Sequence, residues 1–188
     1  MVTNAYLYNG YTVTKNFIKN INACRKCGYR LYAKDDQQVR TGNGNINGNA
    51  VIVVRNTNDA IILDKLYKEL VEDGSSIYDN FYIIYSIRCN TNSQIGFNYD
   101  SIRDCAYILH DELCMITNIV DVVFIGSKLL ELFMQSETRI PNTLIDKRNF
   151  DCITAITMYK SKSRAGHTYF VNEFKKLLTK YNIPIKND

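Results

Sequence analysis

Four cysteines have a spacing that could support chemistry together. Cys24 and Cys27 form a C-x-x-C pair, and Cys89 and Cys105 flank a stretch of fifteen residues. Six cysteines in 188 residues are too few for a disulfide scaffold, and no charged-then-apolar secretory signal opens the sequence. Thiolates from distant parts of one intracellular domain are typical ligands of a metal ion or an iron–sulfur cluster. We therefore predict that these thiols converge on one centre; the alternative is a set of reduced thiols without a ligand.

The other nucleophilic and titratable residues give weaker patterns. Cys114 and Cys152 have no histidine partner evident in the sequence, and we expect ordinary buried thiols. His110 precedes two acidic residues in an amphipathic segment, which predicts a surface position, and His167 begins a basic helix. No Walker-type loop or dinucleotide-binding fingerprint is present. An enzyme is therefore the less favoured class.

The elements that must position these residues alternate between strands and helices. Nearly continuous apolar runs, typical of strands buried on both faces, occur at Ala50–Arg55, Phe81–Ile87, Ile119–Ile125 and Cys152–Met158. Amphipathic patterns predict helices at about Thr14–Ala23, Ala60–Asp73, Ser101–Met115, Ser127–Gln135 and His167–Tyr181. With right-handed crossovers, this order gives a three-layer α/β/α fold with a four-stranded parallel sheet.

Two of the predicted helices carry more detailed expectations. For the helix over residues 60–73, Gly74 is the expected C-terminal stop. Asp100 is the expected N-cap of the helix over residues 101–115. The apolar stripe that we expect to face the sheet from the helix over residues 60–73 contains Ile61, Ile62, Leu66, Leu70 and Val71.

Length and composition predict one domain over residues 1–188, with a short N-terminal arm of about residues 1–13. A content of 46% hydrophobic and 12% aromatic residues supports a folded globule with a sizeable core. No apolar run approaches the roughly 20 residues that span a bilayer. Gly42-Asn43-Gly44-Asn45 predicts a turn rather than a phosphate-binding loop, because it precedes a strand. Ser136–Phe150 is expected to be irregular and exposed.

Charge is unevenly distributed along the chain. The net charge is +4, and residues 147–188 hold nine Lys and Arg against three Asp and Glu. This excess could face an acidic partner such as nucleic acid, or it could be a solvated helix face. The side chains that we expect on the outer side of the last helix, where they could contact DNA or a protein partner, are Lys175, Lys176 and Lys180.

On this frame, the chain resembles the family 4 uracil-DNA glycosylases from about Thr14 to the last helix. The residues that carry the resemblance are Cys24-Arg25-Lys26-Cys27, Gly42-Asn43-Gly44-Asn45, Arg88-Cys89, Cys105 and Val122-Val123-Phe124-Ile125-Gly126. The resemblance implies a uracil-DNA glycosylase-like fold. In that family, four cysteines hold a [4Fe–4S] cluster, which implies the same cluster here, with zinc as a substitute, on Cys24, Cys27, Cys89 and Cys105.

The catalytic positions of that family are not kept in this sequence. Arg55 or Asn56, depending on a one-residue gap, corresponds to the acidic residue that positions the attacking water. Tyr85 corresponds to the asparagine that reads uracil, and Tyr159 to the histidine that stabilises the uracil anion. The segment that brings the base-stacking aromatic residue is largely deleted. Because base excision needs a flipped base in a shaped pocket, the resemblance implies a catalytically dead fold.

Two functions are compatible with such a degenerate glycosylase. Similar proteins are encoded beside virion genes in some tailed bacteriophages, where the fold builds the head-to-tail region. This implies a non-enzymatic ring subunit, made in the host cytoplasm and located in the virion, with copies of itself and portal and tail proteins as partners. A composition rich in Asn, Ile, Tyr and Lys is typical of an AT-rich genome and agrees with that source. The alternative is a divergent DNA-repair glycosylase or DNA-binding protein with an iron–sulfur cluster.

Overall fold

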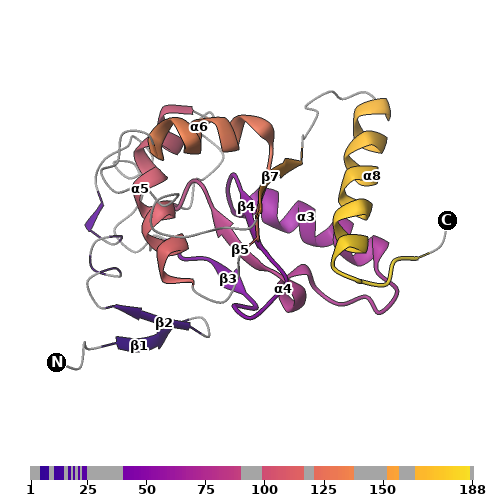
Figure 1. Ribbon diagram of the computed structural model, residues 1–188, viewed down its shortest axis with the longest axis horizontal. Helices are drawn as coiled ribbons and strands as arrows, with labels where there is room; N and C mark the ends of the chain where they lie inside the picture. Colours follow the sequence, from indigo (N-terminus) through magenta and orange to yellow (C-terminus); the bar gives the residue numbers. More distant parts are fainter. Residues whose placement is uncertain are drawn as a thin grey trace.

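A computed structural model gives the architecture of the chain (Figure 1). Its central feature is a five-stranded, mostly parallel sheet flanked by helices. No helix among the described residues is both long enough and apolar enough to cross a membrane. The structure describes residues 5–8, 11–14, 40–89, 99–116, 121–137, 152–156 and 164–186, together with Phe17, Lys19, Ile21, Ala23 and Cys24.

The sheet has the strand order β3-β5-β4-β6-β7. Four neighbouring strands are parallel: β4 (Val51–Val54), β5 (Tyr82–Tyr85), β6 (Asp121–Ile125) and β7 (Cys152–Ile156). Each lies within a predicted strand segment, so the α/β class and the four parallel strands are confirmed. The prediction of a purely four-stranded sheet is wrong, because β3 (Asn43–Gly44) adds an antiparallel edge strand beside β5.

The parallel strands are buried on both faces. In β4, Val51 and Val53 face one hydrophobic cluster, Ile52 and Val54 face the other, and all are fully buried. β-Branched side chains pack well on a pleated surface, and parallel sheets are normally covered on both sides. Burying each such side chain contributes roughly 1.5–3 kcal/mol relative to leaving it exposed. The continuous apolar runs of the sequence follow from this two-sided burial.

Helices cover both faces of the sheet (Figure 1). α5 (Tyr99–Met115) and α6 (Ser127–Glu137) pack on the face of Val51 and Val53. α3 (Thr57–Leu70) and α8 (Arg164–Lys180) pack on the face of Ile52 and Val54, with Phe174 of α8 fully buried. Each of these helices overlaps a predicted helical segment, so the helical layers are confirmed.

Close backbone approach explains the edge strand β3. Gly44 has a φ of +110°, and a Cβ there would lie 2.3 Å from the carbonyl oxygen of Phe81. At Gly42 a Cβ would lie 2.6 Å from the ring of Tyr82. The backbone N–H of Asn45 donates to the carbonyl oxygen of Phe81 at 3.1 Å. Gly42 and Gly44 are therefore needed because the backbone packs closely against Tyr82 and Phe81. The Gly-Asn-Gly-Asn pattern alone is equally compatible with a plain turn.

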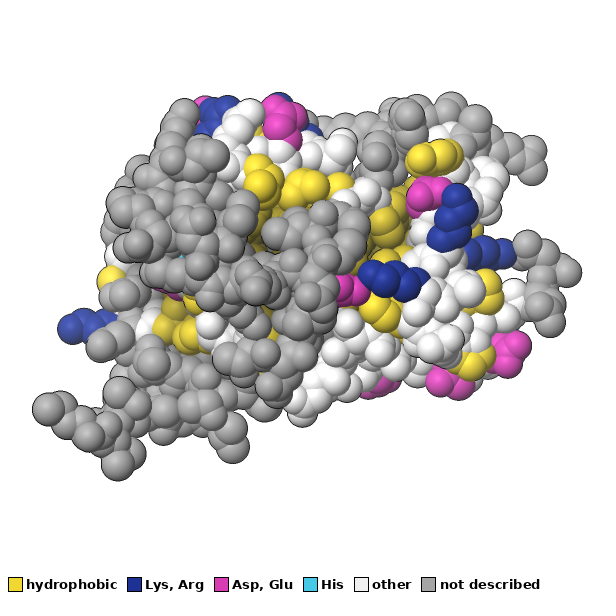
Figure 2. Space-filling model, viewed as in Figure 1, with side chains coloured by type: hydrophobic (Ala, Val, Ile, Leu, Met, Phe, Trp, Pro, Cys, Tyr) yellow, Lys and Arg dark blue, Asp and Glu magenta, His cyan; other side chains and the backbone are white. Residues whose placement is uncertain are grey.

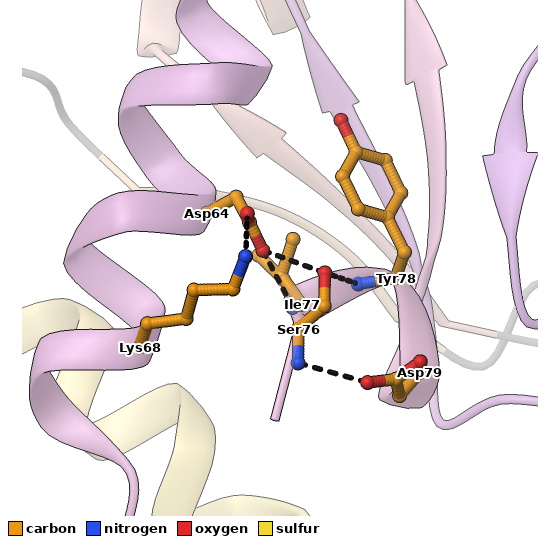
Figure 3. Close-up of polar contacts among 6 residues, drawn as sticks. All are labelled: Asp64, Lys68, Ser76, Ile77, Tyr78 and Asp79. Carbon is orange, nitrogen blue, oxygen red and sulfur yellow. Dashed lines mark hydrogen bonds and ion pairs between the residues drawn. The ribbon is translucent and has the colours of Figure 1, made fainter. Parts of the chain in front are cut away.

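A short helix that the sequence analysis does not predict, α4 (Ile77–Asn80), is joined to α3 by polar contacts (Figure 3). Asp64 of α3 accepts hydrogen bonds from the Ser76 hydroxyl at 2.7 Å and from the Ile77 N–H at 3.0 Å. Lys68 Nζ donates to the same carboxylate at 2.7 Å. Ser76 and Asp79 form a capping box that starts the helix. Because α4 leads directly into β5, these contacts position the start of that strand.

The buried face of α3 agrees with the prediction only in part. Val71 is fully buried and Leu66 and Leu70 pack against the same cluster, as predicted, but Ile61 and Ile62 do not. Ala60, Leu63 and Tyr67 are buried, whereas Ile61 and Ile62 are 52% and 63% exposed. Helical spacing alone allows more than one stripe on this helix, since apolar residues occupy several adjacent positions. The large Tyr67 ring, fully buried and with its hydroxyl accepting from the Asn80 side-chain amide at 2.7 Å, sets the observed face.

The predicted ends of two helices are also corrected. α3 begins after Asn56 and ends at Leu70, so Gly74, with a φ of +63°, lies in the loop beyond the helix. The Val71 N–H donates to the Tyr67 carbonyl and closes the last turn without a glycine. Asp100 lies inside α5, in its first turn, where a carboxylate also interacts favourably with the helix dipole.

The N-terminal arm contains a hairpin. β1 (Ala5–Tyr8) and β2 (Tyr11–Thr14) pair antiparallel in a separate two-stranded sheet. The sequence between them is Asn-Gly, the dipeptide most favoured in two-residue hairpin turns. The predicted N-terminal arm did not include a hairpin. Thr14 therefore belongs to a strand, although residues 17, 19, 21 and 23 are helical as predicted. Of the predicted irregular segment, residues 136 and 137 belong to α6, and the remainder lies outside the described residues.

Candidate functional site

The three predicted metal-binding cysteines that the structure describes are buried, reduced thiols. Cys24 follows the N-terminal helical residues, Cys89 follows β5, and Cys105 lies in α5. Their exposed fractions are 8%, 7% and 2%. Cys24 and Cys89 belong to the same hydrophobic cluster. Cys27 lies outside the described residues.

Tyr107 of α5 interacts with two of these cysteines, through a hydrogen bond to Cys24 and electrostatically with Cys105. Burial raises the pKa of Tyr107, and its hydrogen bond to Cys24 and the nearby Cys24 and Cys105 thiols raise it further. The fold thus brings the N-terminal cysteine close to the α5 helix. Within the described ranges, no three His, Cys, Asp or Glu side chains lie close enough together to hold a metal ion. Cys24, Cys89 and Cys105 are therefore not gathered into a three-ligand group among the described residues, and the cluster stays a prediction.

A buried ion pair lies next to Cys89. The side chains of Arg88 and Glu112 are both fully buried, and Arg88 Nη1 donates to Glu112. Glu112 also accepts from the Gly42 N–H at 2.7 Å and from the Tyr82 hydroxyl at 3.0 Å. Nε and Nη2 of Arg88 are buried and have no hydrogen-bond partner in the part of the chain that the structure describes. Because buried donors are normally hydrogen-bonded, these two N–H groups are exceptions within the described residues.

The residues at the end of β4 are occupied in starting α3. Asn56 is the N-cap of α3, and its side-chain oxygen accepts from the Asp59 N–H at 3.1 Å. Arg55 Nη2 forms an ion pair with Asp59 Oδ1 at 2.6 Å. The carboxyl ends of parallel strands are where functional residues of open α/β sheets gather. At the end of β4, the carboxylate of Asp59 is therefore paired with a neighbouring arginine.

At the strand end that the glycosylase resemblance assigns to base reading, Tyr85 is paired with the half-buried Tyr78. Tyr85, at the end of β5, is 6% exposed. Burial raises the pKa of Tyr85, and a hydrogen bond from Tyr78 only partly offsets that effect. The pKa of Tyr78 is also raised, first by burial. Both phenols therefore remain neutral near pH 7 and cannot act as bases there; Tyr159 lies outside the described residues.

The lysines of α8 are partly neutralised within the chain. Figure 2 shows Lys and Arg side chains over α8 with acidic side chains beside them. Lys176 pairs with Glu173 at 2.7 Å, and Lys180 Nζ lies 2.6 Å from Asp121. Lys175 is half-buried. The predicted outer position of Lys176 and Lys180 is confirmed, but their ion pairs reduce the positive potential that this face presents to DNA.

One cysteine–histidine contact is missed by the sequence prediction. Cys114 Sγ lies 4.0 Å from His110 Nε2, and His110 Nδ1 lies 3.5 Å from Asp111 Oδ1. The expectation that His110 is a surface residue is wrong, because it is only 6% exposed. The expectation that Cys114 lacks a histidine partner is also wrong. The four-residue spacing on one helix is the signal that could have revealed the pair.

Comparison with known proteins does not place the chain in a family: no protein-family model matches it, and no curated protein matches it. Its function must therefore be argued from its own residues and from the glycosylase resemblance of its sequence.

Proposed function

We propose that this chain is a non-enzymatic virion protein, a subunit of a head-to-tail connector ring in a tailed bacteriophage. The virion location and the portal and tail partners follow from the resemblance of the sequence to degenerate family 4 uracil-DNA glycosylases. One structural observation supports the loss of catalysis. At the positions that the resemblance assigns to chemistry, Asn56 caps a helix, Arg55 pairs with Asp59, and Tyr85 is buried. Catalytic groups are directed at a substrate, whereas these groups contact their own protein.

A ring of identical subunits needs two different faces that complement each other. Ile61 and Ile62 on α3 provide a candidate for one face, because these adjacent isoleucines are 52% and 63% exposed. Removing their apolar surface from water would favour association with a neighbouring copy. Tyr169 on α8, which is 47% exposed, adds a large side chain of the kind enriched at interfaces.

The double variant Ile61→Lys/Ile62→Lys tests this assembly. We expect it to form smaller assemblies than the wild type while keeping the same melting transition, because both side chains are exposed. The measurement is light scattering coupled to size exclusion, with negative-stain images of the particles. Asn58→Lys is the matched control, since it adds charge at an exposed position of the same helix without removing apolar surface. A wild type that stays monomeric and binds DNA with steep salt dependence would instead support the DNA-binding alternative.

The proposal includes a [4Fe–4S] cluster, or zinc as a substitute, held by Cys24, Cys27, Cys89 and Cys105. The hydrogen bond of Tyr107 to Cys24, its electrostatic interaction with Cys105, and the Arg88 N–H groups that lack a partner among the described residues support it. After anaerobic purification, we expect stoichiometric iron and sulfide, or zinc. Cys105→Ser should lose the metal, whereas Cys114→Ser should retain it as a matched control on the same helix. If the wild type is normally folded but contains no iron, sulfide or zinc, the cluster is refuted and these cysteines have only a structural role.

A further inference from the structure

Cys114, His110 and Asp111 form a chain of contacts near the C-terminal end of α5 that the proposed function does not use. Cys114 Sγ lies 4.0 Å from His110 Nε2, and the other ring nitrogen lies 3.5 Å from Asp111 Oδ1. Cys114 is reduced and partly exposed, the His110 side chain is 8% exposed, and the Asp111 side chain is 53% exposed. A half-buried thiol is therefore backed by a largely buried imidazole and an outer carboxylate.

This order of groups is the one that activates a thiol. The thiolate is the reacting form of cysteine, and an imidazole within reach can take the thiol proton and stabilise the thiolate as an ion pair. A carboxylate on the second ring nitrogen favours the tautomer in which the first nitrogen accepts that proton. Asp111 is in place to orient His110 in this way, so it is a positioning residue rather than a reacting one.

Because Cys114 lies at the C-terminal end of α5, the reactivity of its thiol depends on the imidazole of His110. Cys114 is the penultimate residue of α5, where the negative end of the helix dipole disfavours an isolated thiolate and favours an imidazolium. A cysteine at this place without its histidine would be a poor nucleophile. We therefore expect Cys114 to react much faster with His110 present than in a variant that lacks this histidine.

We propose that Cys114, with His110 as its proton acceptor, is a site of reversible thiol–disulfide exchange with small-molecule disulfides. Cys114 Sγ gives its proton to His110 Nε2 and attacks one sulfur of the disulfide. A new S–S bond forms to Cys114 as the old one breaks, and the departing sulfur leaves with the bonding electron pair. The imidazolium gives its proton to that thiolate or, where the thiolate is weakly basic, to solvent. One disulfide is therefore consumed, one mixed disulfide and one thiol or thiolate are formed, and no further oxidant is needed.

The probe for this proposal is dithiobis(nitrobenzoate), a small aromatic disulfide whose leaving thiolate is coloured. With the full chain in native buffer, we expect a fast phase that peptide mass mapping assigns to Cys114 and that Cys114→Ser removes. Cys24, Cys89 and Cys105 should not contribute to it, because each is at least nine-tenths buried. His110→Gln should slow the fast phase by roughly tenfold to a hundredfold near pH 7. His167→Gln, at an exposed histidine of α8, is the control and should leave the rate unchanged.

A fast phase that maps to another cysteine, or that His110→Gln leaves unchanged, would overturn the proposal. If His110→Gln does not fold, the pH profile of the wild-type rate decides. A plateau reached by about pH 7 supports the ion pair, whereas a rate that keeps rising through the ordinary thiol range near 8.5 refutes it. These outcomes do not depend on ring assembly or on a cluster, so they leave the proposed function untouched.

Discussion

At the scale of single residues, Glu112 holds together parts of the chain that are far apart in sequence. Its buried carboxylate accepts from the Gly42 N–H of the edge segment, from the Tyr82 hydroxyl of β5 and from Arg88 beyond that strand. Taking two charges out of water is costly, and the cost is offset only while both partners and their hydrogen bonds are present. Removing one partner would leave Arg88 charged and uncompensated in the core.

We therefore expect Glu112→Gln to lower the free energy of unfolding by about 3–5 kcal/mol. Urea denaturation followed by circular dichroism measures this change. Glu131→Gln is the matched control, because Glu131 is on α6, half-exposed, and paired with Lys128 on the surface. If both variants lose equally little stability, the buried pair contributes no more than an ordinary surface ion pair.

At the scale of elements, Asp64 joins α3 to the start of α4 (Figure 3). Burial raises the pKa of Asp64, but hydrogen bonds from Lys68, Ser76 and Ile77 and the charge of Lys68 outweigh burial and lower it. A carboxyl with a lowered pKa in the folded state stabilises the fold above its unfolded pKa of about 3.9. That contribution is lost as the pH falls through the folded value.

Asp64→Asn is accordingly expected to destabilise the protein by roughly 1–2 kcal/mol at neutral pH. The difference from the wild type should narrow as the pH falls below about 4, since the wild-type carboxylate is then protonated as well. Thermal melting over a pH series measures this difference. Asp100→Asn serves as the control, because the Asp100 side chain is 70% exposed. A stability difference that does not change with pH would show that the charge of Asp64 does not matter.

The elements also show what the sequence could predict. The four parallel strands were predictable because two-sided burial demands runs such as Val51–Val54. The edge strand β3 was not, because its glycines are required by contacts with Phe81 and Tyr82, which lie far along the chain. The same reason applies to Ile61 and Ile62 on α3, whose exposure depends on the burial of Tyr67.

In the candidate site, too, local contacts could be predicted from the sequence and contacts between distant elements could not. The contact between Cys114 and His110 is local, because residues four apart on a helix lie on the same face. The buried state of Glu112 depends on Arg88 from another element, which no periodicity in α5 could show. Tyr107 interacts with Cys24 and Cys105, but no three candidate ligands come together among the described residues, so the convergence of the cysteines and the cluster remain predictions.

At the scale of the whole molecule, both faces of the sheet are covered by helices, and Arg55, Asn56 and Asp59 at the end of β4 contact one another. In Figure 1 the N-terminal hairpin lies at the lower left, whereas α3 lies right of the centre, between the strands and α8. Two separate surfaces of this kind are what a head-to-tail contact between identical subunits needs, and a closed ring follows when the rotation between subunits closes. The hairpin and the exposed isoleucines of α3 are therefore the surfaces where we expect neighbours to meet.

The central claim is that the chain is a built-in part of a virion, and quantitative mass spectrometry of purified particles tests it most directly. We predict that the chain is present in particles at a constant ratio to the portal protein, and that this ratio survives stringent washing and nuclease treatment. A connector subunit has such a ratio because a closed ring contains a set number of copies. Detection of the chain only in the cytoplasm of infected cells, and never in washed particles, would contradict the account and favour a DNA-binding role.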